Sequence, residues 1–178
     1  MSRDLQQFYS FLSDELKCDS DGKYVIREKS QSEIKHITIK KGKCFVLKQN
    51  DGFKAGLFKN SIYSCDFILM SDNEVFFVEL KSNSTSTKYI DDENPFDKAL
   101  KQCRSSEMLF DYLCDVYNHQ NNKDLEFKER KFIYLFPQRA NERKTSTNLR
   151  KRNSRLKEKA VECDNNGYLE LELKDLKL

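Results

Sequence analysis

The sequence lacks the residues on which several common classes of enzyme depend. It contains only two histidines, His36 and His119, and its six cysteines include no Cys-x-x-Cys pair. A zinc hydrolase or a histidine-based nucleophilic triad would therefore have few residues from which to be built. The cysteines are more consistent with reduced thiols that fill small spaces in a core.

The chain also lacks long apolar segments. No run approaches the ~20 apolar residues that span a bilayer, and the first seven residues do not resemble the apolar region of a secretory signal. We therefore expect a cytoplasmic protein that does not enter a membrane. A length of 178 residues, with 38% of them hydrophobic, predicts a single globular domain over residues 1–178.

Basic residues are concentrated in one late segment. Residues 139–159 hold nine lysines and arginines against two glutamates, a local charge of +7 in a chain whose formal net charge is +3. This asymmetry indicates a polyanionic partner such as nucleic acid, although a solvated helix face would also explain it. The segment contains no aromatic residue, so it does not indicate stacking on unpaired bases. The candidate phosphate contacts are Arg139, Arg143, Lys144, Arg150, Lys151, Arg152 and Arg155.

Hydrophobic periodicity predicts an α/β domain with a mixed central β-sheet flanked by helices. Helical spacing of apolar residues predicts helices over residues 3–17 and 96–117, and we expect the basic segment at 139–161 to be helical from about Thr147 to Val161. Short apolar runs predict the strands, which we place at residues 24–27, 34–39, 44–47, 65–70, 74–81, 131–136 and 168–173.

Two adjacent apolar strands carry the residues of greatest chemical interest. If Asp72 and Asn73 are the central residues of a hairpin turn, paired positions sum to 145 and Asp66 faces Glu79. Their Cβ atoms would then lie on the order of 5 Å apart. The two-residue period of a strand puts Lys81 on the same face as Glu79. A bulge or a longer loop would move Asp66 out of this opposition.

The pattern Glu-x-Lys is not informative as a string, because it occurs seven times in the chain. Context distinguishes the match at Glu79 and Lys81. Only this match ends a run as apolar as residues 75–78, and only this one follows a second apolar strand that carries an aspartate. The hypothesis therefore depends on three residues together, Asp66, Glu79 and Lys81.

Two carboxylates brought together inside a sheet repel each other, and each resists ionisation unless a cation compensates. Mg²⁺ would supply that compensation, because it prefers oxygen ligands and keeps waters and phosphate oxygens in its shell; Mn²⁺ is an alternative. The expected ligands are Asp66 and Glu79, with the Leu80 carbonyl as a further candidate. Lys81 would orient the attacking water or stabilise developing charge, which indicates phosphodiester hydrolysis. The simpler alternative is a structural ion-pair cluster at a sheet edge.

At this point the residues resemble the active site of the PD-(D/E)XK nuclease superfamily. The resemblance lies in Asp66, a gap of 12 residues, and then Glu79-Leu80-Lys81 at the end of an apolar strand. It extends to the order of elements, with one helix before the sheet and a long helix after the Glu-x-Lys strand, over roughly residues 2–136. Cys65 replaces the proline that names the motif, and this departure leaves the metal ligands untouched.

The resemblance also implies which helical residues reach the site. Many members of the superfamily have a polar residue on the helix after the Glu-x-Lys strand, and Gln102 matches it, with an ordinary surface position as the alternative. An acidic residue of the first helix often joins the site as well. Glu15 could do so, but its place at the far end of that helix favours solvation.

What the resemblance implies for function is a Mg²⁺-dependent nuclease, with DNA as the favoured substrate. Small members of the superfamily often belong to restriction, defence or mobile-element systems. The alternative is a catalytically silent module of the same fold that binds nucleic acid or serves as a subunit of a larger complex. A homodimer and a companion protein subunit both stay open.

Overall fold

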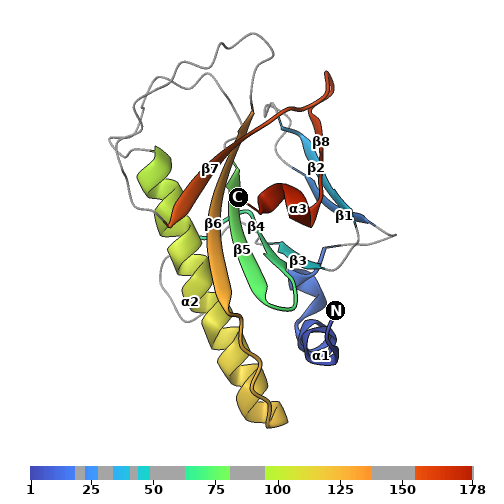
Figure 1. Ribbon diagram of the computed structural model, residues 1–178, viewed down its shortest axis with the longest axis vertical. Helices are drawn as coiled ribbons and strands as arrows, with labels where there is room; N and C mark the ends of the chain where they lie inside the picture. Colours follow the sequence, from blue (N-terminus) through green and yellow to red (C-terminus); the bar gives the residue numbers. More distant parts are fainter. Residues whose placement is uncertain are drawn as a thin grey trace.

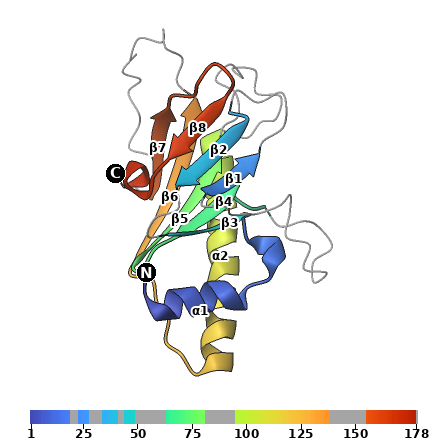
Figure 2. The ribbon, with the colours of Figure 1, turned by 90° about the vertical axis from the view of Figure 1, so that its right-hand side faces the viewer.

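The computed structural model describes residues 1–18, 23–27, 34–40, 44–48, 63–80, 95–137 and 155–177, with the backbone alone for residues 23–27 and 95. The described chain forms three layers, in which a central sheet lies between two helices on one side and a smaller second sheet on the other (Figures 1 and 2). The predicted α/β class with a mixed central sheet is thereby confirmed.

The central sheet has five strands in the order β3-β4-β5-β6-β7. Strand β4 pairs antiparallel with both β3 and β5, whereas β6 pairs parallel with both β5 and β7. Strand β5 is therefore the middle strand, with an antiparallel neighbour on one side and a parallel neighbour on the other. The bounds are β3 (Phe45–Lys48), β4 (Phe67–Met70), β5 (Glu74–Leu80), β6 (Glu129–Pro137) and β7 (Leu156–Val161).

One face of the central sheet is covered by helices α1 (Arg3–Phe11) and α2 (Pro95–Asn121). The Ser2 hydroxyl accepts a hydrogen bond from the Leu5 N–H at 3.2 Å and so caps α1. The helix is shorter than the predicted 3–17, because a separate 3₁₀ turn, η1 (Asp14–Leu16), follows it. No helix in the described part of the chain is long and apolar enough to cross a membrane.

The opposite face is covered by a three-stranded sheet and a short helix (Figure 1). The sheet has the order β1-β2-β8, with β1 and β2 antiparallel and β2 and β8 parallel. The strands were expected near these positions, but their separation into a second sheet was not. The bounds are β1 (Lys23–Arg27), β2 (His36–Lys40), β8 (Tyr168–Leu171) and α3 (Leu173–Leu176).

Strand β5 contributes to two hydrophobic cores, one on each face of the central sheet. Phe77 packs toward the helices, where its ring meets those of Phe110 and Phe132 edge to face at 5.8 and 5.6 Å. Phe76 and Val78 pack toward the second sheet. All three side chains are fully buried. A polar group at the end of this strand is therefore surrounded by apolar structure on both sides.

The prediction of a helix over 147–161 is wrong for its final residues, which form strand β7. Leu156 lies beside Phe132 and Val161 beside Pro137 in a parallel ladder with β6. The intervening Lys-Glu-Lys-Ala favours a helix by local propensity. Pairing with β6 overrides that preference, because it buries Leu156 in the helix-side core and Val161 in the core between the sheets. The rest of the predicted helix, through residue 154, lies outside the described residues.

Candidate functional site

The predicted hairpin register is confirmed at the four paired positions of β4 and β5, where partner numbers sum to 145. The regular ladder ends at Phe67 opposite Val78. The next residue, Asp66, donates its backbone N–H to the Val78 carbonyl at 3.0 Å. Two residues of one strand thus face one of the other, the arrangement of a β-bulge. Asp66 is therefore not the in-register partner of Glu79 that the ideal hairpin predicts.

The side-chain directions confirm this irregularity. Cys65 packs in the helix-side core, while Phe67, two residues later, packs in the core between the sheets. In a regular strand, residues two apart point to the same face. The bulge therefore turns the segment before Phe67 toward α2.

The two carboxyl groups nevertheless meet. One Asp66 oxygen, Oδ2, accepts a hydrogen bond from the Leu80 N–H at 2.6 Å. The Asp66 and Glu79 side chains are also hydrogen-bonded to each other. The backbone of β5 therefore holds the Asp66 carboxyl through the Leu80 N–H, and the same carboxyl contacts Glu79. The predicted juxtaposition is present, although the local backbone that produces it is a bulge.

The ionisation of Glu79 is strongly suppressed. The pKa of Glu79 is raised from 4.5 to about 10, mainly by burial and next by the negative charge of Asp66. Electrostatic interaction with Cys65 and the hydrogen bond with Asp66 raise this pKa further, while a hydrogen bond from Gln102 acts to lower it. Its Oε2 atom is buried and has no hydrogen-bond partner among the described residues. At neutral pH, and without a cation, the Glu79 carboxyl is therefore protonated.

Helix α2 supplies two polar side chains to this region. The Gln102 amide donates to the Ser64 carbonyl at 3.1 Å as well as contacting Glu79. One turn later, the Ser106 hydroxyl accepts a hydrogen bond from the Cys65 N–H at 2.9 Å. Residues four apart lie on the same helix face, so Gln102 and Ser106 both face the bulge. The structure thus places Gln102 at the site rather than on the outer surface of α2.

Two buried thiols, those of Cys65 and Cys103, lie close to the carboxyl pair. The Cys65 thiol donates to the Phe67 carbonyl at 3.4 Å, and the Cys103 thiol donates to the Phe77 carbonyl at 3.6 Å. A hydrogen bond with the Cys65 thiol, together with burial, raises the pKa of Cys103 well above its usual range. The Cys103 thiol therefore stays protonated in the core, and both cysteines are free and buried, in agreement with the prediction of free thiols.

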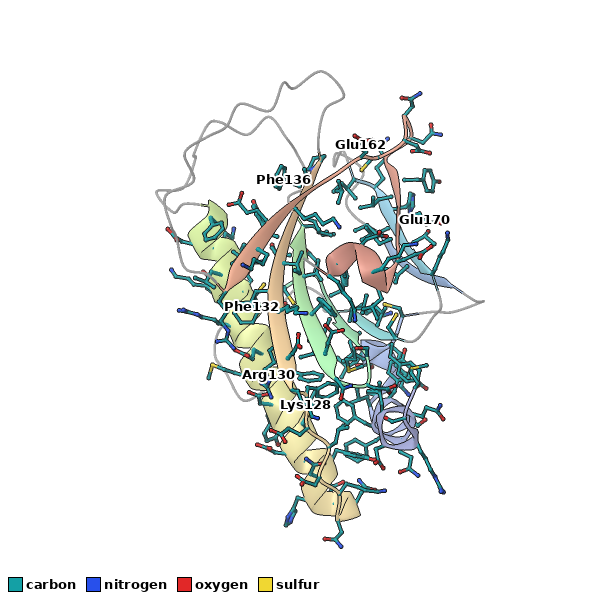
Figure 3. The ribbon with its side chains drawn as sticks, in the orientation of Figure 1. Lys128, Arg130, Phe132, Phe136, Glu162 and Glu170 are labelled. Atoms are coloured by element: carbon teal, nitrogen blue, oxygen red, sulfur yellow. The ribbon has the colours of Figure 1, made fainter. Side chains whose placement is uncertain are left out.

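Tyr134 is a site neighbour that the sequence did not reveal. It lies beside Glu79 in the parallel ladder of β5 and β6, on the helix-side face, and is 9% exposed. Its ring lies 6.5 Å from that of Phe136, which Figure 3 shows near the end of β6. Parallel register is set by a long crossover, so no local signal could have paired Tyr134 with Glu79.

The structure does not test every predicted site residue. Lys81 and the basic residues from Arg139 to Arg152 lie outside the described residues, so their positions stay predictions. Glu15 is exposed on η1, as its distance along the helix suggested. Leu80 is the last residue of β5, and its described contact with the site is made by its N–H, which donates a hydrogen bond to the Asp66 carboxyl.

Arg155, the described member of the predicted phosphate contacts, is engaged within the fold. Its guanidinium pairs with the Glu107 carboxylate of α2 and lies 4.5 Å from the centre of the Phe132 ring. Glu107 is also 3.7 Å from Arg130 of β6. Arg155 therefore links the residue before β7 to α2, and the Glu107 carboxylate partly neutralises its charge.

The donor set fits a hard divalent cation. Within the described ranges, no group of three or more His, Cys, Asp or Glu side chains is arranged to hold a metal ion. Mg²⁺, however, commonly binds through one or two carboxylates and completes its shell with water and substrate oxygens. Asp66 and Glu79 provide two such carboxylates, and the buried Glu79 Oε2 lacks another described partner.

Comparison with known proteins assigns neither a family nor a function. No protein-family model, no curated protein and no solved structure matches this chain. The functional assignment therefore rests on the contacts among Asp66, Glu79 and the facing residues of α2.

Proposed function

We propose that this protein is a Mg²⁺-dependent nuclease that hydrolyses phosphodiester bonds, with DNA as the favoured substrate. The observation that supports the proposal best is the contact between the Asp66 and Glu79 carboxyls, with Glu79 Oε2 buried and unpartnered among the described residues. Such a pair is unfavourable for folding alone, because each charge raises the cost of ionising the other. A divalent cation would relieve that cost.

Two other enclosed carboxylates show what a purely structural role looks like in this protein, because each is paired with a cation. Glu74 pairs with Lys131 at 2.7 Å and with Lys177, and Glu107 pairs with Arg155. Although burial acts to raise it, the hydrogen bonds from Lys131 and Lys177 lower the pKa of Glu74. Among the described residues, no ion pair includes Glu79. The fold thus gives its structural carboxylates cations and gives Glu79 a second carboxyl.

The chain's own residues would divide the work of hydrolysis. Asp66, held by the Leu80 N–H, and Glu79, oriented by Gln102, would ligate the metal. Bound Mg²⁺ would lower the pKa of the attacking water and stabilise negative charge on the phosphate. Lys81 follows directly on the last residue of β5 and would orient that water. The water oxygen would bond to phosphorus and release a proton to solvent as the bond to the leaving oxygen breaks, and the leaving oxygen would take up a proton from solvent.

The basic segment would supply the electrostatic attraction to nucleic acid. Its lysines and arginines would neutralise phosphates without reading sequence. With Arg155 engaged by Glu107, the residues from Arg139 to Arg152 are the ones expected to carry this role. A membership in a restriction, defence or mobile-element system is part of the same proposal and follows from the family resemblance alone.

Cleavage of single- and double-stranded DNA and RNA, with Mg²⁺ and with EDTA, tests the proposal. Asp66→Ala, Glu79→Ala and Lys81→Ala should each abolish Mg²⁺-dependent cleavage while leaving a cooperative thermal transition. Glu162→Gln, at an exposed position shown in Figure 3, is the matched charge-removal control and should cleave normally. Unchanged cleavage in all three site variants would refute the enzyme. A wild-type protein that neither cleaves nor binds Mn²⁺ would be a silent module.

A further inference from the structure

Ser106 is a buried polar residue of α2 whose hydroxyl accepts a hydrogen bond from the backbone of Cys65, the residue directly before Asp66. We infer that Ser106 is a positioning residue, which sets the geometry of Asp66 for metal binding by holding the Cys65 backbone. The inference rests on the proposed function, and it adds a residue that neither the motif nor the family resemblance indicates.

The contact is enclosed at both ends. Ser106 is 1% exposed and Cys65 is fully buried, and the Ser106 hydroxyl accepts the Cys65 N–H at 2.9 Å. A buried backbone N–H requires a partner. The described acceptor of the Cys65 N–H is the Ser106 hydroxyl, which comes from α2 and not from a neighbouring strand. At the bulge, Ser106 therefore satisfies a buried backbone donor from outside the sheet.

Ser106 acts on the same peptide group as Gln102. The Ser64 carbonyl, which Gln102 contacts at 3.1 Å, and the Cys65 N–H, which Ser106 contacts, belong to one planar peptide unit. Carbonyl and N–H point in opposite directions in a trans peptide. Two side chains one helical turn apart, about 5.4 Å along the axis, thus hold both polar ends of that unit. The orientation of the plane is thereby fixed relative to α2.

Asp66 depends directly on this fixed plane. Its own backbone is tied to β5 through Val78, and its carboxyl is tied to Leu80. The chain enters Asp66 from the peptide unit that Gln102 and Ser106 hold. Without the Ser106 hydroxyl, the Cys65 N–H would be buried without its partner, and the segment would relax to find another. The Asp66 carboxyl would then move relative to Glu79.

Mn²⁺ affinity, measured by isothermal titration calorimetry, tests this role independently of catalysis. Loss of a group that orients a metal ligand from outside the coordination shell typically weakens metal binding by about 10- to 100-fold. We expect Ser106→Ala to weaken Mn²⁺ binding at least about tenfold within that range. Ser106→Thr and Ser106→Val form the matched pair, because they share a shape and differ in the hydroxyl. Ser106→Thr should bind Mn²⁺ more tightly than Ser106→Val by a similar factor.

Leu5→Ala, in α1 and fully buried, controls for lost stability, and it should melt earlier while binding Mn²⁺ as the wild type does. The inference is overturned if Ser106→Ala and Ser106→Val bind like the wild type, if Ser106→Thr binds as weakly as Ser106→Val, or if Leu5→Ala weakens binding equally. A wild type that binds no Mn²⁺ refutes the proposed function itself, and with it the inference. Weak binding in Ser106→Ala beside tight binding in the wild type supports both.

Discussion

Replacing Glu79 with glutamine should stabilise the metal-free protein at neutral pH. The folded state raises the pKa of Glu79 from 4.5 to about 10. A carboxyl whose folded pKa lies above its unfolded value favours the folded state only while it is protonated. Its contribution is therefore fully present below about pH 4.5 and is lost progressively as pH rises toward 10. Glutamine is neutral throughout, so it removes this loss.

The magnitude follows from the linkage between protonation and stability. Each pH unit above the unfolded pKa costs about 1.4 kcal/mol until the folded pKa is reached. At pH 7, Glu79→Gln should therefore raise the free energy of unfolding by up to about 3 kcal/mol, and structural relaxation around the charged pair would reduce this. For a chain of this size the corresponding rise in Tm is roughly 5 to 10 °C.

Thermal unfolding in EDTA from pH 4.5 to 8 measures the effect. The Tm difference between Glu79→Gln and wild type should be small at pH 4.5 and should grow with pH. Glu162→Gln removes the same charge from the exposed position shown in Figure 3 and should change stability by less than about 0.5 kcal/mol. Added Mg²⁺ should stabilise the wild type and not Glu79→Gln. A variant no more stable than wild type at pH 8 would refute the description of Glu79 as a desolvated member of a carboxyl pair.

Two further variants separate folding roles from binding roles. Arg155→Ala should lower the free energy of unfolding by about 1–2 kcal/mol in urea titrations, because it removes the Glu107 pair and the contact with Phe132; Lys151→Ala should instead leave stability unchanged and reduce the salt dependence of nucleic-acid binding by about one unit of slope. The reverse pattern would show that Arg155 binds phosphate. Phe110→Ala should cost about 3–5 kcal/mol, since its buried ring packs in the helix-side core, and a loss below 1 kcal/mol would contradict this packing.

The hairpin was predictable because its turn residues and its alternation are local. The Asp72-Asn73 turn fixed the register, and that register holds through Phe67 opposite Val78. The bulge at Asp66 was not predictable. It depends on a peptide unit held by Gln102 and Ser106, side chains some forty residues later in the chain. A pattern read within one hairpin contains no information about such acceptors.

Non-local pairing also explains the other differences. β7 has the composition of a helix and becomes a strand because β6 offers a parallel edge. In the second sheet His36 lies beside Tyr168, and the two rings stack with their centroids 4.7 Å apart. These residues are far apart in sequence, and parallel pairing carries no local turn signal. The predicted strands were therefore largely in the right places, whereas their assignment to sheets depended on contacts that only the folded chain makes.

The position of Glu79 explains why its cost is tolerated. It is at the end of β5, the strand that supplies Phe76, Phe77 and Val78 to both cores. The burial of this strand on both faces also desolvates Glu79. A glutamine there would remove the ionisable group and, with it, the cost of ionising a second carboxyl beside Asp66. The proposed metal site gives this carboxyl a use, because it requires both Asp66 and Glu79.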